Sequence, residues 1–212
     1  MRRGIFVLLL VISTAAVAEA QTDKRISLGG GIGFHNYADP RFETSNFGFA
    51  PMYRLNRGRG ANGWGWDLKA GLTYSEKDVP VAIGGNEVQL GRLHTIPVRV
   101  GIARAYRQGP MKVSGWVSGG PSFNSFDVDN EAVMAQQAIG NDLDAVHVKT
   151  SLAYGPGVSA SWDLSSWLAL QSSFGYTFHR PEVRTVTNGV PTNERWNLDH
   201  SSAALGLVIG IL

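Results

Sequence analysis

The 212-residue sequence contains no cysteine, and this absence excludes several kinds of protein at once. The chain can form no disulfide framework, no thiolate metal site and no cysteine nucleophile. Charge is also scarce, because only 17% of the residues are Asp, Glu, Lys or Arg, and the formal net charge is +2. A net charge this small gives no electrostatic basis for binding nucleic acid.

Long apolar runs are missing too, apart from one short run at the N-terminus. Arg2 and Arg3 precede an apolar stretch over residues 5–17, and an Ala-Glu-Ala cleavage site ends at Ala20. This order of features predicts a secretory signal peptide over residues 1–20. An N-terminal membrane anchor is the alternative, but the run is shorter than the ~20 apolar residues that a spanning helix needs.

The rest of the chain shows apolar residues alternating with small or polar ones. Over residues 64–75, Trp, Leu, Ala and Tyr fill the even positions, and Gly, Asp, Lys, Thr and Ser fill the odd positions. A period of two places the two sets on opposite faces of a strand. The same alternation predicts eight strands, over residues 26–35, 47–55, 64–75, 94–103, 112–123, 146–162, 168–178 and 202–211.

The connections between these strands alternate in length. The long, polar ones cover residues 36–46, 76–91, 125–145 and 179–195, and the short ones cover residues 56–63, 105–110 and 163–166. Long outer loops alternating with short periplasmic turns are typical of an up-and-down barrel in the outer membrane. Within the third long connection, residues 131–138 are predicted to form a short helix.

Period two does not by itself show which face meets water. In a secreted soluble β-sandwich the apolar face is the core, whereas in a membrane barrel it contacts lipid. Two features favour the barrel. Aromatic residues fall near the predicted strand ends, as interfacial girdles do, and the less apolar face is rich in Gly, Ser and Ala, which fit a narrow interior. The predicted fold class is therefore an all-β, eight-stranded antiparallel transmembrane barrel with short periplasmic turns and four long outer loops.

Two stretches resemble a known family. Residues 92–100 (RLHTIPVRV) are similar to a pattern with a central Ile-Pro in the fourth strand of its members. Residues 155–170 are similar to the hairpin that joins their sixth and seventh strands. The family is that of the small bacterial outer-membrane β-barrels of the OmpA-transmembrane or OmpX type. The resemblance implies an outer-membrane barrel domain over residues 21–212, in contact with outer-membrane lipid. It also implies recognition of the C-terminal strand by the outer-membrane assembly machinery. The chain departs from the family in ending on Leu212, where Phe or Tyr is usual.

Six charged residues share the parity of the small residues, so they are predicted to point into the lumen. They are Arg54, Asp67, Lys69, Arg99, Lys112 and Lys149. Arg or Lys on the lipid face near the midplane would cost roughly 2–4 kcal/mol each. We interpret the set as a polar plug that fills the interior, with a narrow anion-favouring path or gate as the alternative.

The five histidines provide no recognisable site. His35, His94, His147, His179 and His200 are far apart in the sequence and match no metal-ligand spacing. His200 and Ser202 share a strand face and are similar to the His-x-Ser pair of the outer-membrane lipid A deacylase barrel. However, Asp199 lies on the opposite face, where it cannot orient His200. The sequence thus predicts no cofactor, no metal and no catalytic residue.

The sequence therefore predicts a non-enzymatic integral outer-membrane protein, with recognition in the long outer loops. A narrow porin-like channel or a barrel that binds a small solute is the main alternative. A lipid A-modifying barrel and a secreted β-sandwich are less favoured. The sequence names no extracellular ligand.

Overall fold

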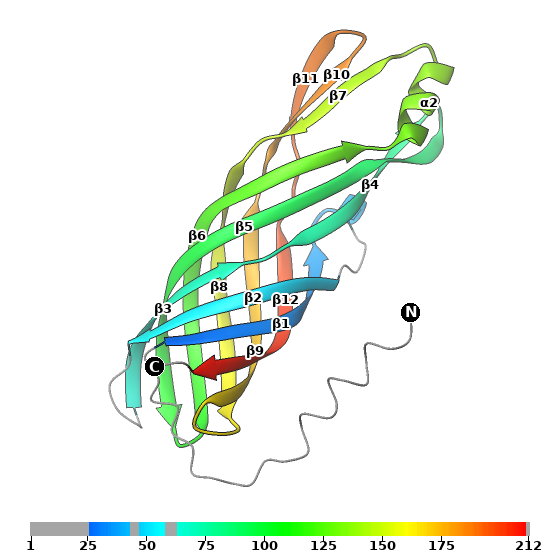
Figure 1. The fold of residues 1–212 in the computed structure, drawn as a ribbon. Helices are drawn as coiled ribbons and strands as arrows, with labels where there is room; N and C mark the ends of the chain where they lie inside the picture. The colour runs from blue at the N-terminus through cyan, green and yellow to red at the C-terminus, as the bar shows by residue number, and fades with distance from the viewer. Residues whose placement is uncertain (1–25, 43–46, 58–62, 211–212) are drawn as a thin grey trace, which may run out of the picture.

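The computed structural model describes residues 26–42, 47–57 and 63–210, with residue 26 and residues 47–57 described by their backbone alone (Figure 1). The predicted signal peptide and Leu212 lie outside these residues. The strands are β1 (Ile26–Tyr37), β2 (Phe47–Arg57), β3 (Gly63–Leu72), β4 (Ser75–Ile83), β5 (Asn86–Gln108), β6 (Met111–Val128), β7 (Leu143–Val148), β8 (Ser151–Asp163), β9 (Leu168–His179), β10 (Glu182–Thr187), β11 (Val190–Arg195) and β12 (His200–Gly210). The helices are the 3-10 turn η1 (Pro40–Phe42) and α2 (Asn130–Ala138).

Eight of these strands close into a barrel. Hydrogen-bonded neighbours run β1, β2, β3, β5, β6, β8, β9, β12 and back to β1, and every pair is antiparallel. The closing pair of β1 and β12 extends from Ser27 opposite Gly210 to Tyr37 opposite His200. Because an unpaired backbone group in lipid costs several kcal/mol, a sheet that spans a membrane has to close. The described strands confirm the predicted eight-stranded up-and-down barrel.

On one side the strands continue well past the barrel wall, and α2, β7, β10 and β11 gather at that end (Figure 1). β5 is 23 residues long: its C-terminal half pairs with β3 in the wall, and its N-terminal half pairs with β4 beyond it. β7, β10 and β11 form a separate three-stranded sheet. We call residues 37–42, 76–93, 125–149 and 180–199 the outer extension.

The outer extension corrects one part of the sequence prediction. Residues 76–91 and 179–195 were expected to be polar loops, but most of their residues lie in the hairpins β4–β5 and β10–β11. Both central residues of each turn have a positive φ. The values are 60° at Gly84 and 87° at Gly85 in the first turn, and 52° at Asn188 and 72° at Gly189 in the second. Gly-Gly and Asn-Gly are the pairs that two-residue hairpin turns favour, so a loop assignment overlooked a local hairpin signal.

The helix predicted over residues 131–138 is confirmed as α2. Asp129 caps its N-terminus, where a side-chain oxygen of Asp129 accepts a hydrogen bond of 3.0 Å from the Glu131 backbone N–H. This cap satisfies one of the backbone donors that every helix leaves free in its first turn.

The main apolar core lies in the outer extension and not in the barrel. Its buried members come from β1, η1, β4, β5, α2, β7, β10 and the segment before β12. They are Tyr37, Phe42, Val79, Ile83, Leu93, Ala132, Leu143, Val146, Val148, Val183, Trp196 and Leu198. The outer extension is therefore a packed structure with its own core.

The barrel itself has the opposite polarity. Apolar side chains cover its outer face: Leu68, Val100 and Val117 are 56%, 65% and 60% exposed. The residues next to them in sequence point inward, and Asp67 is only 2% exposed. Apolar out and polar in is the arrangement of a transmembrane barrel. Among the described residues, no helix is long and apolar enough to span a membrane.

Aromatic side chains border this apolar belt at both ends. At the inner end, Trp64 and Trp66 on β3 are 64% and 56% exposed, and the Arg104 guanidinium lies 5.3 and 5.0 Å from their ring centroids. At the outer end, the rings of Tyr154 and Phe178 stack with centroids 5.3 Å apart. Two aromatic girdles mark the membrane interfaces of outer-membrane barrels, and they place the lipid boundary here.

Small residues let the interior fill without crowding. Trp116 on β6 lies inside the barrel against Gly157 and Gly175, and a Cβ atom on Gly175 would come within 3.1 Å of its ring. A larger residue at either glycine would displace the ring. The Gly-rich face predicted to line the lumen thus makes room for the Trp116 ring.

The polarity of the wall gives a direct prediction for stability. Val100 lies midway along the belt-forming part of β5, so Val100→Lys should destabilise the folded barrel by about 2–4 kcal/mol. Val190 on β11 is 61% exposed but lies outside the belt, so Val190→Lys should change stability by less than about 0.5 kcal/mol. Urea unfolding in lipid vesicles measures both. Equal costs at the two positions would contradict the assigned lipid face.

Candidate functional site

Two buried ion pairs occupy the inner end of the barrel. Lys112 Nζ on β6 lies 2.7 Å from Asp67 Oδ2 on β3, and their side chains are 7% and 1% exposed. Arg107 Nη1 on β5 lies 2.9 Å from Asp163 Oδ2 on β8, with side chains 12% and 1% exposed. Each pair joins strands that are separated by one other strand in the barrel order. Both pairs are buried inside the barrel, and each links two strands of the wall.

Lys69 and Arg99 continue the polar interior toward the outer side. Lys69 Nζ donates to Ser114 Oγ at 3.3 Å and to Ser159 Oγ at 3.2 Å, and it lies 5.4 Å from the Trp116 ring centroid. Arg99 Nη1 donates to Thr177 Oγ1 across the lumen at 2.9 Å. The structure thus brings Asp67, Lys69, Arg99 and Lys112 into one interior, while their role as a plug stays a prediction.

The other two predicted lumen residues do not join this set. Lys149 follows β7 in the outer extension, where its side chain is 58% exposed and its Nζ lies 2.7 Å from Glu182 Oε1. Its placement in the lumen was wrong, because the strand alternation was carried across the break between β7 and β8. The Lys149 charge lowers the pKa of the Glu182 carboxyl through this contact. The Arg54 side chain lies outside the described residues.

Two interior residues were missed from the sequence. Arg107 and Asp163 share the inward parity of Ala103 and Ser161, but they lie beyond the ends of the predicted strands over residues 94–103 and 146–162. The same alternation, extended along β5 to the β5–β6 turn, would have identified Arg107 as an inward residue. Extended along β8 to the β8–β9 turn, it would have identified Asp163.

A cavity of about 120 Å³ lies in the middle of the interior. Small residues form most of its lining, together with the Trp116 ring and the side chains of His35, Lys69 and Arg99. A second cavity of about 20 Å³ lies at the outer end and is lined by His35, His179 and His200, among others. The two cavities share His35, Thr73 and Arg99, so they adjoin.

The five histidines are far apart in the sequence, but the structure brings three of them together around one cavity. His35 lies near the end of β1, His179 ends β9, and His200 begins β12, which pairs with both strands. The rings of His35 and His200 meet edge to face with centroids 4.9 Å apart. In a closed barrel the outer ends of the first and last strands meet, so the predicted closure was the signal that could have placed His35 beside His200. Among the described residues no group of three or more His, Asp or Glu could hold a metal ion.

The candidate lipid-hydrolysing pair is not assembled as a relay. His200 Nδ1 donates to the Leu198 carbonyl oxygen at 2.9 Å, and Ser202 Oγ contacts the Gly175 carbonyl oxygen at 3.5 Å. Asp199 accepts hydrogen bonds from the His179 backbone N–H and from the Arg180 guanidinium, so it orients neither partner. In this structure His200 and Ser202 therefore each contact a backbone carbonyl oxygen, and no hydrogen bond joins the two side chains.

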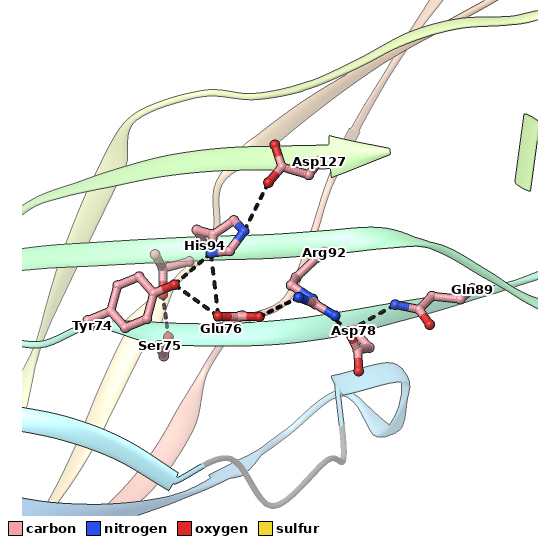
Figure 2. A network of polar contacts seen from close by, with 9 residues as sticks. Tyr74, Ser75, Glu76, Asp78, Gln89, Arg92, His94 and Asp127 are labelled. Atoms are coloured by element: carbon pink, nitrogen blue, oxygen red, sulfur yellow. Dashed lines mark hydrogen bonds and ion pairs between the residues drawn. The ribbon is translucent and has the colours of Figure 1, made fainter. Parts of the chain in front are cut away.

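A second polar network lies on the exposed face of β4, β5 and β6 (Figure 2). His94 Nε2 lies 3.2 Å from Asp127 Oδ2, and its Nδ1 lies 2.8 Å from the Tyr74 hydroxyl, which is 3.0 Å from Glu76 Oε2. When His94 is charged, both its N–H groups donate and the Tyr74 hydroxyl donates to Glu76, so every contact in the chain is satisfied. The network links β4, β5 and β6 through their side chains.

Arg92 extends the same network along β4. Its guanidinium lies 2.9 Å from Glu76 Oε1 and 3.2 Å from Asp78 Oδ1, which also accepts from the Gln89 amide at 2.9 Å (Figure 2). All these side chains are partly exposed, and exposed ion pairs contribute only about 0–1 kcal/mol each. The network therefore adds only modestly to the stability with which the β4–β5 hairpin is held on the barrel.

The overall fold matches solved structures of outer-membrane proteins. No family model matches the chain, and no curated protein matches its sequence. OprG from Pseudomonas aeruginosa superposes with a TM-score of 0.71 at 12% identity, over 91% of this chain and 98% of that chain. Escherichia coli outer membrane protein W gives 0.50 at 12% identity, over 92% and 100% of the two chains. The attachment invasion locus protein Ail of Yersinia pestis gives 0.50 at 11% identity, over 87% and 95%.

The chain therefore has the fold of the small eight-stranded outer-membrane β-barrels of bacteria. The closed wall, the apolar outer belt and the two aromatic girdles agree with that class and place the protein in the outer membrane, in contact with its lipid. At these identities, the likeness concerns the fold alone.

The interior ion pairs give a test that separates buried from exposed charge. Lys112→Met removes the positive charge that lies 2.7 Å from the buried Asp67 carboxylate and should destabilise the barrel by about 3–5 kcal/mol. Lys149→Met breaks an exposed pair and should cost at most about 1 kcal/mol. The double variant Asp67→Leu with Lys112→Met should recover most of the loss. Urea unfolding followed by the heat-modifiable shift on gels measures all three, and similar costs for the two single variants would contradict the interior placement.

Proposed function

We propose that the protein is a non-enzymatic outer-membrane barrel that presents a rigid recognition surface outside the cell and does not conduct ions. The observation that carries the proposal is the apolar core of the outer extension. Phe42, Leu93 and Val183 are fully buried in it, at 0% exposure. Loops that only connect strands do not need such a core, whereas a surface that has to keep its shape does.

The barrel interior supports the same proposal. The ion pairs Asp67–Lys112 and Arg107–Asp163 lie at the inner end, and the elements that form the core of the outer extension lie beyond the other end (Figure 1). Eight-stranded barrels enclose side chains and not a wide water path. A barrel with this interior is suited to anchoring the surface that it carries.

Planar-bilayer recording tests the absence of a channel. Purified protein inserted into the bilayer should give no stable conductance in potassium chloride at any applied voltage, because buried ion pairs obstruct the inner end. The variant that replaces Asp67 by Leu and Lys112 by Met serves as control, since it keeps this volume filled and should be equally silent. Steady ohmic steps from the wild-type protein would reject the proposal in favour of a narrow channel.

The projecting hairpin β10–β11 is the part of the outer extension best placed for recognition. Every residue of β11 is exposed, and β11 is an edge strand of the three-stranded sheet. Arg184 and Asn193 face each other across the hairpin, so residues 185–192 can be replaced by Asn-Gly without disturbing the barrel.

Cells that carry the wild-type protein should attach to glycan-coated or cell-coated surfaces more strongly than cells without the protein. Cells that carry the shortened variant should lose this gain. The variant should still show the gel shift of a folded barrel. Equal attachment of the shortened and wild-type forms, or no gain from the wild-type protein, would contradict recognition by this hairpin.

The absence of lipid A hydrolysis is part of the same proposal. It is supported by the hydrogen bonds of His200 and Ser202 to backbone carbonyl oxygens. Lipid A extracted from cells with wild-type protein and from cells with His200→Ala should have the same mass spectrum as lipid A from cells without the protein. Loss of an acyl chain with the wild-type protein alone would make the protein an enzyme.

One observation favours a second function, the binding of a small solute. The 120 Å³ cavity adjoins Lys69 and Arg99, and its remaining lining is mostly small residues and Trp116. Cavities with an apolar lining and few polar groups are the usual form of small-molecule sites. Such a site is compatible with a barrel that does not conduct.

A further inference from the structure

We infer that the outer end of the barrel interior, where it continues into the outer extension, is a binding site for a small carboxylate, an organic anion with a short apolar body. The inference specifies the ligand of the second function proposed above and rests on it. The carboxylate would lie among Lys77, Arg99 and the three clustered histidines, and the body would lie in the adjoining 120 Å³ cavity.

The side chains around the 20 Å³ cavity come from five strands. They are His35 on β1, Lys77 on β4, Arg99 on β5, His179 on β9 and His200 on β12. All five can carry positive charge, and all the other lining residues are neutral at pH 7. The cavity therefore favours a negative ligand.

Lys77 is the least expected of these residues. Its side chain is only 1% exposed, and Nζ has no hydrogen-bond partner among the described residues. It packs against the face of the Tyr37 ring and lies 5.9 Å from the Phe42 ring centroid. Both ring nitrogens of His35 are likewise buried without a hydrogen bond. Buried donors without acceptors are rare in proteins, so two of them at one cavity indicate a site built for an acceptor.

The nearby carboxylates do not serve this cavity. Asp199 Oδ2 accepts two hydrogen bonds from Arg180, at 3.1 and 2.7 Å, and Asp199 Oδ1 accepts from the His179 backbone N–H at 2.7 Å. Glu76 and Asp78 lie on the outward face of β4, in the surface network of Figure 2. Lys77 thus differs from Lys112, whose charge is matched by Asp67 in the same interior.

The sizes of the cavities define the ligand further. About 20 Å³ is room for one or two groups the size of a water molecule, which suits the two oxygens of a carboxylate better than a tetrahedral phosphate. Arg99 lines both cavities and has donors left beyond the one that it gives to Thr177. The next cavity is six times larger and mostly apolar, which suits a body of a few carbon atoms.

Binding should depend on pH in a defined direction. β4 lies beyond the apolar belt, and burial there lowers the pKa of Lys77 to about 6. Around neutral pH the amine of the free protein is therefore largely uncharged, and an anion binds best after the amine takes up a proton. The groups that face Lys77 are His35, Arg99, His179 and His200, together with the Tyr37 phenol, and none of them supplies a negative charge near neutral pH. Affinity should thus rise as pH falls from 8 to 6, by up to about tenfold per unit.

The experiment measures binding of butyrate labelled with ¹³C at the carboxyl carbon to the full barrel in nonionic detergent, by NMR titration. Butyramide, which has the same shape and no charge, and inorganic phosphate are titrated in parallel. Butyrate should saturate, and it should bind at least tenfold more tightly than butyramide or phosphate. Lys77→Met should weaken butyrate binding at least tenfold, whereas the matched surface variant Lys149→Met should leave it unchanged. The gel shift confirms that each variant is folded.

Several results would overturn the inference, and they separate it from the second function on which it rests. Equal binding of butyrate and butyramide would leave small-solute binding in place and reject the anion site. Tighter binding of phosphate would reject a carboxylate. No saturable binding of any probe would reject both the inference and the second function. An affinity for butyrate that does not change between pH 8 and 6, or that survives Lys77→Met, would remove Lys77 from the site. The comparison of probes uses wild-type protein, so it stands even if Lys77→Met fails to fold.

Discussion

The structure depends on one constraint: a β-sheet in lipid has to pair every backbone group and therefore has to close on itself. Closure turns one face of every strand toward acyl chains and the other toward a narrow shared interior. Leu68 and Asp67, which are neighbours in sequence, consequently meet opposite environments, and Leu68 is 56% exposed while Asp67 is 2% exposed. The polarity of the barrel follows from this closure, and so does the need for small residues inside.

A narrow interior also decides how its charges have to behave. Taking an ion out of water is costly unless a partner compensates it. At the inner end the protein supplies both partners, as in Asp67 with Lys112 and Arg107 with Asp163. At the outer end Lys77 has only neutral or basic groups around it. The same physical rule therefore gives the inner end a structural role and makes the outer end a place for a ligand to supply the missing acceptor.

The sequence predicted the barrel because apolar and polar residues alternate with a period of two along each strand, and the structure places the two sets on opposite faces. It also predicted that Asp67, Lys69, Arg99 and Lys112 point inward, since parity alone decides facing. It failed where parity was carried across a break, at Lys149, and where hairpins above the membrane were taken for loops, although Gly84-Gly85 and Asn188-Gly189 were visible turn signals. The histidine cluster was invisible to any spacing rule, because its members become neighbours only when the first and last strands pair.

Paramagnetic relaxation from lipids that carry a spin label in the acyl chain tests most directly whether the apolar face contacts lipid. With methyl-labelled protein in bilayers, the methyl signals of Leu68, Val98, Val100 and Leu207 should broaden strongly. The signals of Leu93 and Val183, which are buried in the outer extension, should stay sharp. Sharp signals from Leu68 and Val100, with broadening confined to the outer extension, would show that the barrel had been assigned inside out.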